Sequence, residues 1–61
     1  MLIYENIKRI CKEKGISIRS VEKKAGLGNG TIRKWTNSKP TIDNLQTVAN
    51  VLCVKVSKLL E

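Results

Sequence analysis

The chain contains no histidine and only two cysteines, Cys11 and Cys53, among its 61 residues. Structural zinc sites take four ligands, mainly cysteine and histidine, so the usual zinc arrangements are excluded. The two cysteines are 42 positions apart without a CxxC pair, and the sequence shows no signal peptide. We therefore expect an intracellular, cytoplasmic and reduced protein, in which both thiols serve as small hydrophobic side chains.

Aromatic residues, acidic residues and long apolar runs are also scarce. One Tyr and one Trp are too few for the stacking platform on which single-strand binders hold bases. The apolar runs are only a few residues long, which excludes a membrane span. The five carboxylates show no clustering and have no histidine beside them. We therefore expect no enzymatic activity and no cofactor.

What the chain has in excess is positive charge. Twelve Lys and Arg residues face five Asp and Glu residues, for a net charge of +7. Ten of the basic residues but only two acidic ones, Glu13 and Glu22, lie between Lys8 and Lys39. Taken alone, this excess is as typical of a solvated face as of a surface that binds a polyanion such as nucleic acid.

Apolar periodicity predicts helices along the whole chain. The first helix begins at Ile3 and ends at Gly15. Its apolar residues recur at i, i+4, i+7 and i+8, which predicts one buried face. The second runs from about residue 18 to 25, with Ser17 as its N-cap and Gly26 as its end. The third runs from about residue 29 to 35, with Gly28 in the cap position.

A fourth helix, capped by Thr41, carries the clearest periodic face, and a short fifth helix closes the chain. The fourth helix presents Ile42, Leu45, Val48, Ala49 and Leu52, and the fifth holds Val56, Leu59 and Leu60. We therefore expect one all-α, five-helix domain over residues 1–61, near the lower size limit for a core without disulfides or metal. Its predicted core comprises Ile7, Ile10, Val21, Leu27, Ile32, Trp35, Leu45, Val48, Ala49, Leu52 and Leu59.

The segment SIRSVEKKAGLGNGTIRKW, residues 17–35, has the layout of a helix-turn-helix. Two short helices flank a glycine-centred turn, and cations occupy the faces that point away from the core. In such a motif the second helix enters the DNA major groove. We place the motif at about residues 17–36 and its recognition helix at about residues 28–35. Because the basic segment and this motif coincide, the charge favours nucleic acid over a solvated face.

The chain resembles the lambda-repressor-like family of helix-turn-helix proteins, also called the Cro/CI or XRE type, from Ile3 to Leu60. The resemblance rests on Gly15-Ile16-Ser17, Gly26, Ile32 and Trp35, and on TIDNLQTVANVLCV and VSKLL after the Lys39-Pro40 loop. Three residues depart from the family pattern: Ile18 replaces a glutamine, Glu22 a small residue and Cys53 a glycine. If Glu22 faces the third helix, its carboxylate needs a partner or a route to solvent. Many relatives carry an Arg and a Glu where this chain has Cys11 and Thr36, and we expect these two residues to form a neutral contact instead.

The resemblance implies two sets of DNA contacts. Base edges are expected to meet Asn29, Gly30, Thr31, Arg33 and Lys34. Phosphates are expected to meet Ser17, Arg19, Ser20, Asn37 and Lys39. Two plainer interpretations stay open: Asn29 satisfies local backbone at a helix start, and Lys34 is simply solvated.

The sequence therefore predicts a regulator that binds double-stranded DNA, a repressor of phage, mobile-element or similar bacterial origin. We expect a homodimer on a palindromic operator, with no membrane and no small-molecule ligand. The alternatives are an antitoxin-like, protein-interaction or RNA-binding module on the same fold, and a basic peripheral membrane binder. The last would need an exposed apolar face, which these helices are expected to bury.

Overall fold

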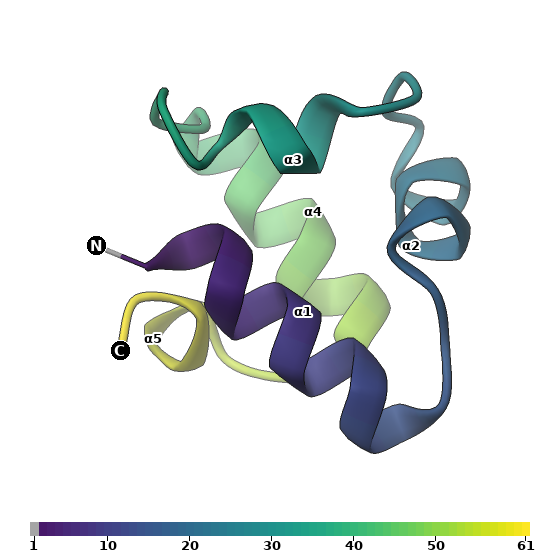
Figure 1. Ribbon diagram of the computed structural model, residues 1–61. Coiled ribbons are helices and arrows are strands. Elements are labelled where there is room, and N and C mark those ends of the chain that lie inside the picture. Colours follow the sequence, from purple (N-terminus) through teal and green to yellow (C-terminus); the bar gives the residue numbers. More distant parts are fainter. Residues whose placement is uncertain (1) are drawn as a thin grey trace.

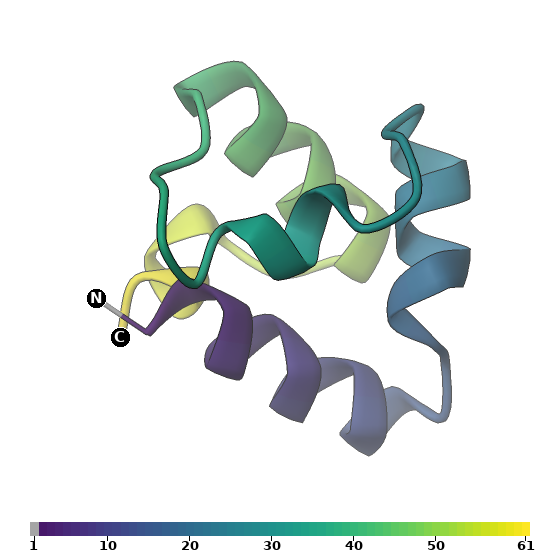
Figure 2. The same cartoon turned by 45° about the horizontal axis from the view of Figure 1, so that its top comes forward.

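The computed structural model describes residues 2–61, which form five α-helices and no strand (Figure 1). The helices are α1 (Ile3–Lys14), α2 (Ile18–Ala25), α3 (Thr31–Lys34), α4 (Ile42–Leu52) and α5 (Val56–Leu59). Helix α2 packs mainly on α4, and α1 packs on both α2 and α5. Figures 1 and 2 show α1, α2 and α3 arranged around α4. The predicted all-α, five-helix architecture is confirmed.

Local side-chain and glycine chemistry sets most helix ends. The hydroxyl of Ser17 accepts the Ser20 N–H at 3.0 Å, and the hydroxyl of Thr41 accepts the Asn44 N–H at 3.1 Å. Both residues are therefore the predicted N-caps. Helices α1 and α2 end at Gly15 and Gly26, whose φ angles of 70° and 74° lie in the left-handed region.

Helix α4 ends in the same left-handed conformation, but without a glycine. Cys53 has a φ of 58° and is the one non-glycine residue with positive φ within residues 2–61. Its N–H donates to the Asn50 carbonyl oxygen at 3.1 Å, and the next N–H, that of Val54, donates to Ala49 at 3.0 Å. A Cβ atom makes this conformation costly, so the end of α4 carries local strain that a glycine would relieve.

The apolar faces converge on one core between the helices. Ten of the eleven predicted core residues are buried, including Trp35 at 7% exposure, and Ile3 and Cys11 join them. The exception is Leu27, which is only partly buried and packs against the edge of the core. Ile42 also departs from the predicted α4 face. It is 78% exposed because it is the first residue of the helix, where no neighbouring element covers it.

A buried polar contact joins the two ends of the chain. The side-chain amide of Asn6 is 5% exposed and donates to the Leu59 carbonyl oxygen at 2.9 Å. This bond satisfies a carbonyl at the end of α5, which is too short to satisfy all of its own. It therefore fixes α5 against the first turn of α1.

The two cysteines lie in different environments, and both are free. Cys11 is buried in the core, where burial raises the pKa of its thiol. Cys53 is exposed, so the expectation that both thiols serve as small hydrophobic side chains is wrong for Cys53. Cys53 is the C-cap of α4 and lies beyond the last buried residue of that helix, Leu52.

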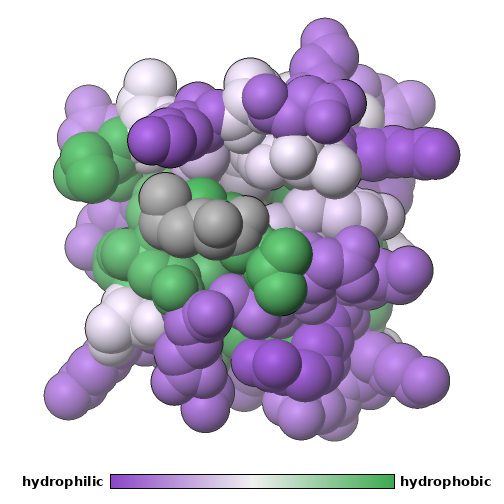
Figure 3. Space-filling view, turned by 60° about the vertical axis from the view of Figure 1, so that its left-hand side comes forward, coloured by the Kyte–Doolittle hydropathy of each residue, from purple (hydrophilic) through white to green (hydrophobic). Residues whose placement is uncertain are grey.

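A small apolar area remains uncovered. Figure 3 views the side of the molecule on which the chain ends lie, and apolar side chains there are surrounded by hydrophilic ones. Within residues 2–61, the exposed large apolar residues are Leu2, Ile42 and Leu60. Among residues 2–61, none of the helices has the length and apolar character needed to cross a bilayer.

We expect the substitution Val48→Ala to destabilise the protein by about 1–3 kcal/mol, because it removes buried methyl groups and leaves a cavity. Val48 is fully buried in α4. The free energy of unfolding in urea measures the effect. Ile42→Ala, in the same helix but exposed, is the control and should change stability by no more than about 0.5 kcal/mol. Equal losses in the two variants would contradict the assigned core.

The strain at the end of α4 gives a second prediction. Cys53→Gly should be about 1 kcal/mol more stable than Cys53→Ala, because only glycine removes the Cβ atom from the left-handed conformation. Both variants lack the thiol, so their difference in unfolding free energy isolates the backbone term. Equal stability would show that the backbone relaxes at no cost.

Candidate nucleic-acid interface

A turn over residues 26–30 joins α2 to α3 and determines where α3 begins. Gly30 has a φ of 85°, which is incompatible with an α-helix, so α3 starts at Thr31 and Gly30 occupies the N-cap position. The predicted start at about residues 28–29 with a Gly28 cap is therefore wrong. After Lys34 the chain continues in tight turns, in which the N–H groups of Trp35, Thr36 and Asn37 each donate to the carbonyl three residues before.

A carboxylate from α2 supports this turn. Glu22 is 2% exposed, and its two oxygens accept backbone N–H groups of Gly30 at 3.3 Å and Ile32 at 3.1 Å. A guanidinium nitrogen of Arg19 lies 3.6 Å from the same carboxylate. The buried Glu22 carboxylate is therefore paired with two backbone N–H groups and with the exposed Arg19 guanidinium. These are the partners that a carboxylate facing the third helix was expected to need.

The predicted base-contact residues surround the start and the free side of α3. Asn29, Arg33 and Lys34 are exposed, and Gly30 and Thr31 are partly buried. The Asn29 side chain makes no hydrogen bond within residues 2–61, so it does not satisfy local backbone. Gly30 differs from the others, because its N–H donates to Glu22 and its carbonyl accepts the Lys34 N–H at 3.2 Å.

The predicted phosphate-contact residues fall into two groups on either side of α3. Ser17, Arg19 and Ser20 lie at the start of α2, where the Ser17 hydroxyl is occupied by the cap and Arg19 faces Glu22. Asn37 and Lys39 are exposed in the loop between α3 and α4. Both groups present polar side chains. In the first group, Ser17 and Arg19 also make contacts within the protein.

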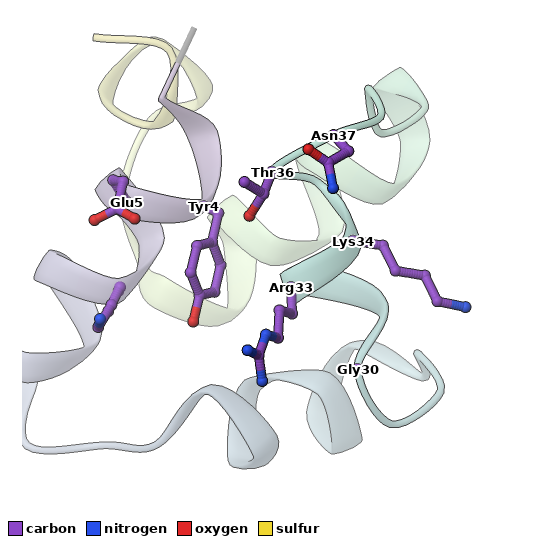
Figure 4. Close-up of a pocket in the computed structure, with 8 residues that line it drawn as sticks. Tyr4, Glu5, Gly30, Arg33, Lys34, Thr36 and Asn37 are labelled. Atoms are coloured by element: carbon purple, nitrogen blue, oxygen red, sulfur yellow. The ribbon is translucent and has the colours of Figure 1, made fainter.

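A polar hollow of about 720 Å³ separates α3 from the first turns of α1, and sequence reasoning did not find it. Tyr4 and Lys8 border it from α1, and Arg33 borders it from α3. Figure 4 shows the Arg33 side chain directed toward Tyr4, whereas the Lys34 side chain extends away from Tyr4. The i, i+4 spacing places Tyr4 and Lys8 on one face of α1, but only the tertiary structure turns that face toward α3.

Most of the cations in the basic segment have no acidic partner. Of the ten basic residues between Lys8 and Lys39, only Arg9 and Arg19 form ion pairs within residues 2–61. Lys8, Arg33 and Lys34 border the hollow with Glu5 as its one acid. Unpaired cations at this density produce a positive potential that attracts polyanions and is weakened by salt.

The expected contact between Cys11 and Thr36 is wrong. Thr36 is exposed and borders the hollow together with Tyr4 and Glu5 of the first turn of α1. Cys11 is 2% exposed and lies about two turns further along α1, where it packs in the core. Cys11 therefore fills space beside its apolar neighbours, and Thr36 faces solvent.

We expect Gly30→Ala to destabilise the protein by about 1–2 kcal/mol, because a Cβ atom strains the left-handed conformation at φ 85°. Gly28→Ala is the matched control two residues away. Its new Cβ would meet the Thr31 hydroxyl at 3.5 Å, which is ordinary contact, and Gly28 lacks positive φ. Thermal unfolding of both variants tests the assignment, which fails if Gly28→Ala loses as much stability as Gly30→Ala.

Comparison with known proteins agrees with this geometry. A helix-turn-helix family model matches residues 7–59, which include α2, α3 and the turn between them. No match was found among curated proteins. Within residues 2–61 no three Cys, Asp or Glu side chains are grouped as metal ligands. The family is one of DNA-binding regulators rather than of enzymes. The chain belongs to the lambda-repressor-like, or XRE-type, helix-turn-helix family of DNA-binding transcription regulators.

Proposed function

We propose that this protein is a sequence-specific repressor of phage, mobile-element or similar bacterial origin, and that α3 enters the major groove of double-stranded DNA. The observation that carries the proposal is the combination of a free, polar side of α3 with surrounding cations that lack acidic partners. A helix needs both features in the groove, because cations supply affinity for phosphate and polar side chains distinguish bases. Acting on DNA, such a regulator belongs in the cytoplasm.

Base readout is assigned to side chains on the free side of α3 and at its start. The exposed Lys34 side chain extends away from Tyr4 (Figure 4) and would donate to the O6 and N7 acceptors of guanine. Asn29 would pair with adenine through the oxygen and the nitrogen of its side-chain amide. Thr31 and Arg33 flank them. The backbone groups of Gly30 are occupied within the chain, which favours a conformational role for this residue over readout.

Phosphate contacts are assigned to both flanks of α3. Ser17, Arg19 and Ser20 supply one flank, from the start of α2, and Asn37 and Lys39 supply the other. Tyr4 and Lys8 extend this second set along α1, because they border the hollow that Arg33 also borders. The residues that line this hollow are mainly polar, and its three cations outnumber its one acid, which suits a sugar-phosphate backbone better than an apolar small molecule.

A homodimer on a palindromic operator completes the proposal. Leu2 and Leu60 are exposed at the ends of the chain, where α1 packs on α5, and an apolar surface there suits a second copy. A two-fold symmetric dimer would place two α3 helices on half-sites about one turn of DNA apart. Residues 17–36 are proposed as the helix-turn-helix core of a single domain, 1–61.

Selection of bound fragments from a pool of random duplex DNA tests the function. We expect one recurring sequence with two symmetric halves. Band shifts with single-stranded RNA and binding to anionic vesicles, both at matched salt, are the comparison arms. Preference for RNA over every duplex would favour the RNA-binding alternative. Preference for vesicles would favour a membrane surface, and recovery of random sequence would contradict specific readout.

The division between readout and positioning gives a prediction on two lysines. On the selected duplex, Lys34→Ala should cost roughly 1–3 kcal/mol of binding free energy and relax the preference for one base. Lys39→Ala is the matched variant, with the same loss of charge. It should weaken binding to all duplexes alike and lower the slope of log K against log salt by about 1. Titrations of selected and random duplexes at several salt concentrations measure both effects. The division is wrong if Lys34→Ala weakens selected and random duplexes equally.

A further inference from the structure

The carboxylate of Glu22 is a buried charge whose hydrogen bonds all go to another part of the chain. Its partners lie eight and ten residues further on, at Gly30 and Ile32, and both are backbone N–H groups. Only the pairing with Arg19 is local, and Arg19 is about half exposed. A buried carboxylate is costly without partners, so these contacts hold two segments of the chain together.

The two N–H groups need an acceptor from outside α3. The first N–H groups of any helix lack intrahelical partners, and a side chain at the N-cap usually supplies one. Here the N-cap is Gly30, which has no side chain and makes no cap bond. Glu22, on α2, therefore accepts hydrogen bonds at the start of α3, as the side chain of a serine or aspartate at the N-cap would. The carboxylate also places negative charge behind the positive end of the helix dipole.

This arrangement leaves the outer side of the turn unobstructed. Asn29 and Thr31 flank Gly30, and neither side chain is occupied by capping α3. Because the carboxylate occupies the N–H groups of Gly30 and Ile32, they are not free to hold a phosphate. Recognition at this end of α3 then depends on side chains, whose positions depend on the angle at which the turn is held.

We propose that Glu22 is a positioning residue for base recognition: its carboxylate fixes the end of the turn over residues 26–30 and the start of α3 before DNA arrives. The inference rests on the proposed function, since it concerns the same face of α3. A fixed turn reduces the ordering cost of binding the correct sequence, and it prevents α3 from adapting to incorrect ones. Loss of the carboxylate thus lowers selectivity without lowering affinity for random DNA.

The two hydrogen bonds from the Gly30 and Ile32 N–H groups to the Glu22 carboxylate are called the clamp below. Amide hydrogen exchange of the unmodified protein tests this clamp without any substitution. The Ile32 N–H donates to the Glu22 carboxylate rather than to a carbonyl of its own helix. We expect this amide and that of Gly30 to exchange more slowly than unprotected peptide. If both exchange at the unprotected rate while the Val48 amide stays protected, the proposal is overturned.

Glu22→Gln and Glu13→Gln form a matched pair for the second test. Each removes one negative charge, but Glu13 is exposed on α1 and forms no ion pair within residues 2–61. Both variants should therefore bind random duplex slightly more tightly. Only Glu22→Gln should speed exchange at Gly30 and Ile32 by about tenfold or more. Only this variant should also lower the ratio of selected to random duplex affinity, by about tenfold.

The outcomes separate the clamp from the proposed function. Equal affinity ratios in the two variants would overturn positioning, and a lower melting temperature with an unchanged ratio would make Glu22 merely structural. If Glu22→Gln does not fold, exchange of Gly30 and Ile32 in the unmodified protein still decides the clamp. If the unmodified protein prefers no duplex, the proposed function fails and positioning for readout fails with it. Slow exchange at both amides that Glu22→Gln accelerates would then still show that Glu22 holds the turn.

Discussion

Helix α3 is too short to exist by itself, and every functional proposal for this protein depends on what holds it. Four residues form barely one turn, and a single turn does not offset the entropy of fixing its backbone. The helix is held at three points: the Glu22 carboxylate binds its first N–H groups, and Ile32 and Trp35 insert into the core. The orientation of Lys34 and Asn29 is therefore a property of the whole domain.

The protein combines a strongly positive surface with one buried negative charge. Long-range attraction to phosphate is strong but carries no sequence information, whereas hydrogen bonds to base edges discriminate over short distances. A net charge of +7 favours polyanions of any sequence, so the proposed selectivity would have to come from the geometry of α3. Glu22 slightly lowers the net charge but binds the backbone at the start of α3. In the proposed function, this buried acid contributes to discrimination while the exposed cations contribute to affinity.

The small core is stabilised without a disulfide or a metal cluster in residues 2–61. Buried apolar residues of α1, α2, α4 and α5 form one cluster, to which α3 adds Ile32 and its C-cap adds Trp35. The buried bond from Asn6 to the Leu59 carbonyl closes the domain at the chain ends, far from α3 along the sequence. The exposed apolar residues near this closure lie at Leu2 and Leu60. The surface proposed for a second copy thus neighbours the contact that closes the domain.

The amino-acid sequence by itself determined the helix content, most helix ends and the core. Local sequence patterns are sufficient to predict these features, because each acts over only a few residues. The patterns are apolar periodicity, the Ser17 and Thr41 caps, and the glycines at 15 and 26. The family also followed from local features, because the spacing of Gly15, Gly26, Ile32 and Trp35 is written in the chain. Exposure at helix ends was less predictable, as Ile42 and Cys53 show, because periodicity does not reveal where neighbouring helices stop.

Only the tertiary structure decided the start of α3, the partners of Glu22 and the neighbours of Thr36. Gly30 adopts a left-handed conformation and its N–H donates to a carboxylate eight residues earlier, and no local rule pairs those groups. Thr36 borders the same hollow as Tyr4 and Glu5, whereas Cys11 is buried in the core. Such contacts arise from the packing of whole helices, and packing angles depend on many side chains at once. For that reason the sequence indicated which residues are candidates for the interface, while the fold determined how they are held.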